Sequence, residues 1–294
     1  MTVVTGPTST AHGRSASSRR LEALTAIPRR SARRRARALF PEEPANWKIA
    51  LTVAAIVVLV FALWEVLGTI GVINTFFWSK PSLVWQALTI QFSKGTILGD
   101  LRFTATSTAL GFLIGVGGGA LIGLSFWWSR YYARTAEPLL IALEAMPKLA
   151  LAPMIVLALG LGLASKVAMA TAIVIVIQVL NTYAAVRRVD RDEQTLLYSL
   201  GASRLQVFTK VVVPSTLPSI ISSFRVAIGL ALTGAIVGEY IGAKEGLGKL
   251  IQIAASTFDI SLIWVGVFTL AVLAFVLYIV VAVIERLLLR LMHG

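Results

Sequence analysis

Long apolar stretches alternate with short polar ones along most of the chain, and six of them are as long as a membrane-spanning helix. Such a helix needs about 20 predominantly apolar residues, because the hydrocarbon layer is about 30 Å thick. Charged or turn-forming residues bound each stretch, so the pattern predicts an all-α membrane protein with six transmembrane helices. The predicted spans are Ile49–Ile70, Thr106–Trp127, Pro138–Leu163, Val167–Val186, Ser219–Ile241 and Ser261–Ile284.

The polar loop between the fourth and fifth predicted spans, residues 187–218, has a pattern of its own. Gly201 is expected to end a first short helix, because glycine readily adopts the left-handed conformation found there. Ser203 and Gln206 have the spacing of a capping box that starts a second helix, and Pro214 is expected to stop it. The apolar stripe of this second helix is Leu205, Phe208, Val211 and Val212. Such a loop is either an amphipathic connector or a docking element for a cytosolic partner.

Composition agrees with a membrane protein, since 57% of the residues are hydrophobic, only 14% are charged and the mean hydropathy is +0.82. The net charge of +13 raises the question of nucleic-acid binding. However, nine arginines precede the first span, in residues 1–45, a Ser-, Arg- and Pro-rich tail that we expect to be disordered. A basic tail there is better explained as an orientation signal or an anionic-lipid contact, so we expect no nucleic-acid partner.

The distribution of lysine and arginine predicts the orientation in the cell membrane. Excluding the basic tail, the short segments between spans carry more of them on the side of the two termini and of the polar loop. Because basic residues concentrate on the cytoplasmic side, we expect both termini and the polar loop to be cytoplasmic.

Residue types needed for many chemistries are missing. The chain has no cysteine, and its two histidines, His12 and His293, lie in the tails. No phosphate-binding Gly-x-x-x-x-Gly-Lys-Ser/Thr motif occurs either. We therefore expect no catalytic residue, no metal site and no cofactor bound by this chain. A membrane-embedded enzyme and an ion-driven secondary transporter remain as alternatives, although no internal repeat supports the latter.

The second predicted span carries a stripe of glycines at every fourth position: Gly111, Gly115, Gly119 and Gly123. In lipid, apolar side chains gain little by leaving the acyl chains, so small residues that allow close backbone approach drive helix association. The stripe predicts a tight contact with a helix of this chain or of another.

Three ionisable residues within the spans are candidates for a substrate pathway, because charges there are costly and face protein or water. Glu144 and Lys148 are four residues apart on the third span, next to Pro147, and Glu239 is near the outer end of the fifth. Lys148 and Glu239 either line the pathway or are structural, Lys148 in an ion pair with Glu144 and Glu239 at the membrane interface. Residues 243–258 predict a short outer helix, either a gate element or a surface cover.

The polar loop resembles the cytoplasmic coupling loop of permease subunits of binding-protein-dependent ABC importers. Their pattern is Glu-Ala-Ala, three residues, Gly, nine residues, then Ile-x-Leu-Pro. Gly201 stands at the glycine of that pattern, and Val211, Val213 and Pro214 stand at its Ile, Leu and Pro. The Glu-Ala-Ala positions hold Thr195, Leu196 and Leu197 instead.

Four further segments resemble the nitrate, sulfonate and taurine branch of these permeases: Trp78–Leu88, Met146–Pro153, Gly160–Lys166 and Gly238–Ile251. The resemblance runs from about Trp64 to the C-terminus and implies a type I importer permease fold. It also implies that the loop docks on an ATPase through Thr195, Leu196, Leu197, Gly201, Ala202, Ser203, Leu205, Phe208, Val211, Val213 and Pro214.

The partners that this resemblance implies are a cytosolic ABC ATPase dimer that binds ATP and magnesium, a second permease copy in a homodimer, an extracytoplasmic substrate-binding protein and membrane lipid. The substrate implied is a small anion such as nitrate, a sulfonate or taurine, or a related small organic molecule.

Overall fold

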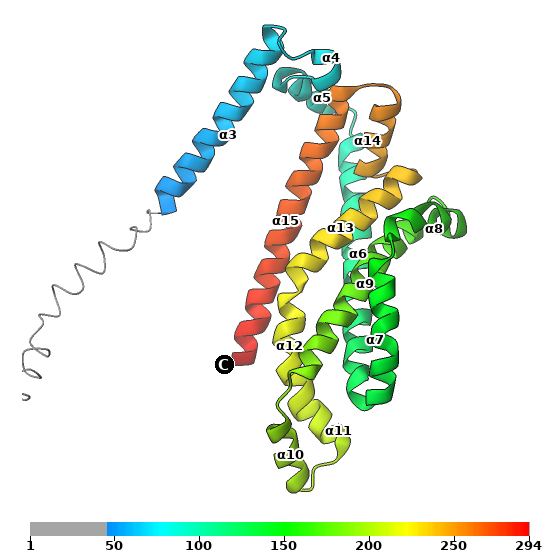
Figure 1. Cartoon of the computed structure of the whole chain (residues 1–294). Coiled ribbons are helices and arrows are strands. Elements are labelled where there is room, and N and C mark those ends of the chain that lie inside the picture. The colour runs from blue at the N-terminus through cyan, green and yellow to red at the C-terminus, as the bar shows by residue number, and fades with distance from the viewer. Residues whose placement is uncertain (1–45, 294) are drawn as a thin grey trace, which may run out of the picture. The chain divides into compact units, whose positions relative to one another are not determined.

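The computed structural model describes residues 46–293, and every regular element within that range is a helix (Figure 1). The chain divides into two units, the second running from Leu63 onward. The described part of the first unit is helical and belongs to α3 (Asn46–Thr69), most of whose apolar side chains are exposed, as expected for a helix in lipid. The predicted disordered tail, residues 1–45, lies outside the described residues.

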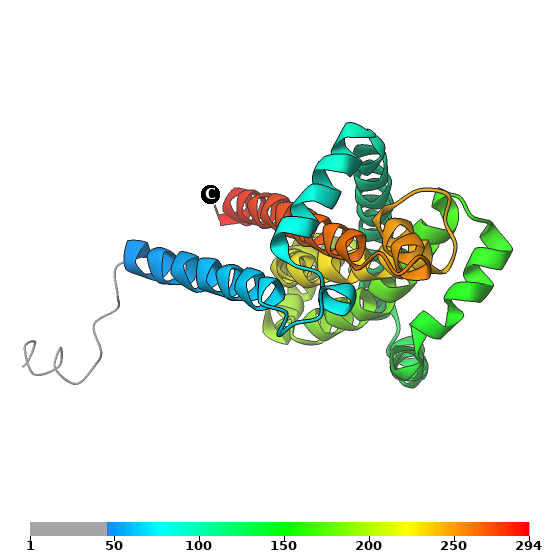
Figure 2. The same ribbon diagram turned by 90° about the horizontal axis from the view of Figure 1, so that it is seen from above.

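Three helices form the centre of the second unit: α6 (Thr96–Ser125), α9 (Leu163–Arg187) and α13 (Phe224–Ile241). They lie side by side in both views (Figures 1 and 2). Their shared core mixes small residues with a few large ones, so the backbones approach closely. From these three helices the core takes Phe112, Val116, Ala170, Val174, Ala227, Ile228, Ala231 and Ala235, and the last helix of the chain adds Val281.

Short helices gather at one end of this bundle: α4 (Thr75–Trp78), α5 (Pro81–Ser93) and α14 (Leu247–Ser256) (Figure 1). The long α15 (Ile260–His293) begins there and runs along the bundle. Trp264 stacks on Phe268 at 5.4 Å between ring centres, and Leu247, the first residue of α14, is fully buried. The short helix predicted over residues 243–258 is therefore present.

The third predicted span, Pro138–Leu163, is not a single helix. Instead α7 (Arg130–Ala145) meets a second segment, η2 (Lys148–Leu151) followed by α8 (Ala152–Leu159), at 77°. Met146 between them is extended, because the ring of Pro147 disfavours the helical conformation in the residue before it. The segment is either a broken span or a re-entrant loop.

The prediction that Pro214 ends the second loop helix is wrong. One helix runs over Arg204–Ser222 through α11 (Arg204–Val207), η3 (Phe208–Val212) and α12 (Val213–Ser222). The η3 segment is π-helical, and Pro214 follows it in the first turn of α12. Because proline has no N–H, one backbone hydrogen bond of the continuous helix is not made at this point. This helix ends at Ser222 and α13 begins at Phe224, so the fifth span is α13 rather than Ser219–Ile241.

Six described helices are long and apolar enough to cross a membrane, which confirms the predicted fold class and number. Their identity differs in one place. The helix Arg204–Ser222 passes this test, whereas the bent pair of α7 and α8 counts as a seventh span only when it is taken together.

Candidate functional site: the polar loop and the buried charges

The first helix of the polar loop, α10 (Arg191–Ser199), is fixed at both ends. The Asp190 carboxylate accepts a hydrogen bond from the Asp192 amide at 2.8 Å and so caps its N-terminus. At the other end Gly201 is left-handed with φ +82°, and Ala202 and Gly201 donate to the carbonyls of Leu197 and Tyr198. These bonds form a Schellman motif, so the helix end predicted at Gly201 is present.

The second helix of the loop starts at the predicted capping box. The Ser203 backbone N–H donates to Gln206 Oε1 at 2.7 Å, and the Gln206 backbone N–H donates to Ser203 Oγ at 3.3 Å. The hydrogen bonds that cap the two short helices at this turn are therefore all made within the loop. The turn between the helices is for that reason a defined structure rather than a flexible connection.

A cluster of buried valines holds the base of the loop to the bundle. It consists of Val186, Val189, Val211 and Val212, with Leu124, Trp127, Leu197 and Phe208 packed around it. Trp127, in the short helix η1 (Phe126–Trp128) after α6, lies 5.4 Å from the Phe208 ring. The Arg204 guanidinium is 5.3 Å from both the Trp127 and Trp128 rings, at cation–π distance. The loop is thus attached to α6 as well as to α9.

The eleven residues expected to contact an ATPase divide into two groups. Val211 is buried, and Leu197, Ala202, Phe208 and Val213 are half-buried at the base. The exposed members are Thr195, Leu196, Gly201, Ser203, Leu205 and Pro214. Three leucines at the end of the loop, the loop tip, stand out because Leu196, Leu200 and Leu205 are 59%, 77% and 60% exposed. Figure 1 shows α10 and α11 beyond the ends of the bundle helices.

Glu144 and Lys148 form an ion pair at the break between α7 and η2, with Lys148 Nζ 2.7 Å from Glu144 Oε2. The pair spans Pro147, which breaks the helix, so it joins the two segments across their bend. The structural ion pair that the spacing predicts is therefore present. Whether Lys148 also attracts substrate stays a prediction.

Glu239 is fully buried within the protein, and both alternatives for it, the substrate pathway and the membrane interface, stay predictions. Its Oε2 accepts hydrogen bonds from Thr104 Oγ1 on α6 and from the Gly248 amide of α14, both at 2.9 Å. Its Oε1 lies 3.4 Å from Ser107 Oγ, and Thr104 Oγ1 also accepts from the Leu247 amide. The carboxylate therefore ties α6, α13 and α14 together.

Lys166 lies in the first turn of α9 and is fully buried. Its Nζ donates to Ser165 Oγ at 2.9 Å and to the Gly242 carbonyl, and its charge interacts favourably with that of Glu239. Buried opposite charges need such partners, because leaving either one alone in an apolar interior is costly. The sequence feature that could have indicated this buried charge is the position of Lys166 directly before the apolar span that begins at Val167.

The glycine stripe lies against α9 of the same chain. A Cβ added to Gly111 would lie 2.2 Å from Ala170 Cβ, and one added to Gly119 would lie 2.8 Å from the Ile175 carbonyl oxygen. At these positions any side chain would push the two helices apart. Gly117 is on the same helix, and no atom of another described segment lies within 4 Å of a Cβ added there.

Replacing Gly111 by alanine should destabilise the protein by about 1–3 kcal/mol, because the added methyl overlaps α9. Thermal unfolding in detergent measures the effect, and Gly117→Ala is the matched control with little expected change. Equal melting temperatures for the two variants would show that α6 and α9 are not packed as described.

Replacing Glu239 by glutamine should lower the stability by about 2 kcal/mol, because a neutral amide oxygen accepts these hydrogen bonds more weakly than a carboxylate and buried Lys166 loses a nearby opposite charge. Glu245→Gln, at an exposed position of the same end, is the control. A Glu239→Gln variant that melts like Glu245→Gln would contradict the role of the carboxylate as an anchor.

The geometry is that of a membrane helix bundle with a capped, protruding loop, and comparison with known proteins agrees. Residues 111–293 match the family model described as the inner membrane component of binding-protein-dependent transport systems. This match covers more than half of the chain and includes the polar loop. The chain belongs to this family. It is therefore a transport subunit of an ABC importer that forms part of the path through the inner membrane.

Curated relatives of this permease cover most of its length. It is 35% identical to the riboflavin transport system permease protein RibX of Chloroflexus aurantiacus, over 82% of this chain and 90% of RibX. It is 31% identical to the formylaminopyrimidine transport permease protein ThiX of Halalkalibacterium halodurans, over 68% of this chain and 80% of ThiX. The putative aliphatic sulfonates transport permease protein SsuC of Bacillus subtilis is 27% identical, over 83% and 88% of the two chains.

A solved structure has the same fold. An inward-facing form of the MetNI methionine ABC transporter gives a TM-score of 0.52 at 18% identity, over 64% of this permease and 91% of the matched chain. The predicted family and type I permease fold are thereby confirmed.

Proposed function

We propose that this permease works as one of two identical membrane subunits, with the polar loop seated on a cytosolic ABC ATPase that binds ATP and magnesium. The observation that carries this proposal is the loop tip. Leu196, Leu200 and Leu205 expose apolar side chains on helices whose ends are fully capped. A rigid apolar tip clear of the bundle suits a groove on a protein partner better than contact with water.

The loop is built to transmit movement from that partner. The helix Arg204–Ser222 runs without a break from the tip toward the bundle, where α12 packs against α9 and α15. The valine cluster and the Trp127–Phe208 contact join the base of the loop to α6 and α9. A displacement of the tip therefore acts on the central helices as a lever, while a flexible loop would absorb it.

The same proposal gives the orientation. An ATPase is cytosolic, so the loop tip and both termini face the cytoplasm, as the distribution of basic residues predicts. The opposite end, with α14 held by Glu239, then faces an extracytoplasmic binding protein. We place the bend at Pro147, with Glu144 and Lys148, beside the substrate pathway, because backbone that departs from a helix within a membrane lines a cavity or packs on protein.

The substrate proposed is a small organic molecule delivered by that binding protein. Identity to the riboflavin and formylaminopyrimidine permeases, 35% and 31%, exceeds the 27% and 26% to the sulfonate and taurine permeases. A nitrogen heterocycle is therefore favoured over nitrate, a sulfonate or taurine. Lys148 is held by Glu144 at 2.7 Å, so its charge is already compensated and does not require an anionic substrate.

Gly201 provides a sharp test of docking. Among residues 46–293, no atom beyond its two chain neighbours lies within 4 Å of a Cβ added there, so a larger side chain projects toward the partner rather than into the permease. Gly201→Glu should reduce ATP-driven uptake at least tenfold, because it places bulk and charge beside the tip. Gly201→Asn is the control, since asparagine tolerates the left-handed conformation and adds no charge.

Uptake is measured in proteoliposomes that contain the permease, its ATPase and its binding protein, with thermal unfolding as a check on folding. Equal uptake by the two variants would remove the docking assignment. Uptake by the permease without any ATPase, driven by an ion gradient, would point instead to a secondary transporter.

A further inference from the structure

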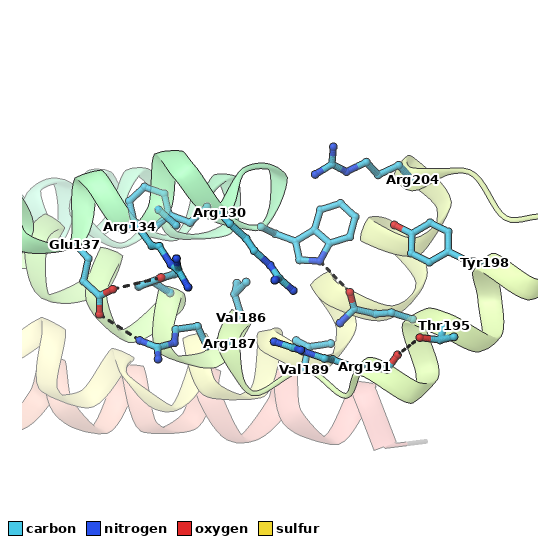
Figure 3. A pocket seen from close by; sticks show the side chains of 15 residues that line it. Arg130, Arg134, Glu137, Val186, Arg187, Val189, Arg191, Thr195, Tyr198 and Arg204 are labelled. Atoms are coloured by element: carbon cyan, nitrogen blue, oxygen red, sulfur yellow. Dashed lines mark hydrogen bonds and ion pairs between the residues drawn. The ribbon is translucent and has the colours of Figure 1, made fainter.

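A second feature lies at the loop end of the bundle, and Thr195 is the one residue that it shares with the eleven expected to contact the ATPase. A cavity of about 660 Å³ lies between α7, α9 and α10, with η1 and the start of α11 at its edge. Five arginines line it: Arg130, Arg134, Arg187, Arg191 and Arg204. Figure 3 shows them converging on this cavity, the arginine pocket, from four different elements. Both α7 and α10 contribute arginines, so the pocket joins segments about 60 residues apart in sequence.

The positive charge of the arginine pocket is largely uncompensated. Glu137 is the one acidic residue among those lining it, and its oxygens already contact Arg187 at 3.2 Å and Tyr183 Oη at 3.5 Å. Arg130, Arg134 and Arg191 have no acidic partner among residues 46–293. Asp190, Asp192 and Glu193 are near in sequence but do not line the pocket, and Asp190 caps α10.

A preference for basic residues on the cytoplasmic side does not explain this arrangement. That preference requires arginines near this end of the helices, but it does not require them to face one another around a single space. Like charges brought together repel, so their convergence costs free energy unless an anion occupies the space. The planar guanidinium groups present paired N–H donors, which match the oxygens of a phosphate group.

We infer that the arginine pocket binds the phosphate headgroup of an anionic membrane phospholipid. The location supports a lipid source, because basic pockets between transmembrane helices on the cytoplasmic side bind such headgroups. Trp127 lines the pocket, and the exposed rings of Trp128 and Tyr131 lie close to it in sequence, as in the aromatic belt at a membrane surface. Farther along α7, exposed Leu139 and Leu143 offer an apolar surface for acyl chains.

This inference does not depend on the docking of an ATPase. It requires only that the pocket lies at headgroup depth, which follows from its place at the ends of α7 and α9. A headgroup seated there would bridge α7 and α9 to α10, and so would neutralise the repulsion between arginines of different elements.

The test compares lipid binding by the purified full-length permease in detergent, using native mass spectrometry. The probes are phosphatidylglycerol and phosphatidylcholine with identical acyl chains. The wild type should bind phosphatidylglycerol at least tenfold more tightly. Arg130→Gln/Arg134→Gln should lose at least tenfold of that affinity, since each basic group near an anionic headgroup contributes about fivefold.

The matched control is Arg286→Gln/Arg290→Gln, which removes the same charge from exposed positions of α15 outside the pocket. It should bind phosphatidylglycerol within about twofold of the wild type. If the double pocket variant does not fold, Arg134→Gln alone and the headgroup preference of the wild type still decide the question.

Three results would overturn the inference. The first is no preference of the wild type for phosphatidylglycerol, and the second is an equal loss in the pocket variant and its control. The third is a pocket variant that binds phosphatidylglycerol as tightly as the wild type but no longer binds inorganic phosphate or the ATPase, which the wild type binds. Either form of the third result would assign the pocket to a soluble phosphate or to a protein partner.

Discussion

Close backbone contact between α6 and α9 is the constraint on which the remaining structure depends. Within a membrane, the burial of apolar side chains contributes little to helix association. Van der Waals contact between closely packed helices must therefore provide the stabilisation that the hydrophobic effect provides in water-soluble proteins. Gly111 and Gly119 bring α6 within contact of Ala170 and Ile175 on α9. On the other side of α9, a Cβ at Gly234 of α13 would lie 2.7 Å from the Ala170 backbone. Ala170 is thus approached from both sides, and the three helices form one tightly packed unit.

Polar contacts are placed at the two ends of this unit, where they serve different purposes. At one end Glu239 and Lys166 are fully buried and satisfy backbone groups of α14 and of the turn after α13. At the other end, charged side chains stay accessible around the arginine pocket and apolar ones at the loop tip. At one end the buried charged groups are therefore satisfied within the protein. At the other end, accessible charged and apolar side chains are available to bind partners.

Much of this could be predicted from sequence, because the signals were local. Span length, the spacing of four glycines and the capping box of Ser203 and Gln206 each follow from a few neighbouring residues. The errors came from prolines. Pro147 was placed inside a span that it breaks, and Pro214 was given a helix end where a π-helical segment lets the helix continue. Each proline has the same local effect on the residue before it, so whether the chain bends, as at Pro147, or continues as a helix, as at Pro214, depends on the surrounding helices. The partners of Glu239 and the convergence of the arginines were likewise invisible, because they join distant segments.

The π-helical segment at Phe208–Val212 has a geometric consequence for the loop tip. A π turn inserts one residue more than an α-helix would need, which rotates everything on one side by about 100° relative to the other. With that offset, Val207, Val211 and Val212 share a buried face with Thr216, Ile220 and Ile221. The one extra residue in the π-helical segment therefore sets the direction in which the leucines of the loop tip point. Removing it would turn the tip aside while leaving its sequence, its caps and nearly its full reach unchanged.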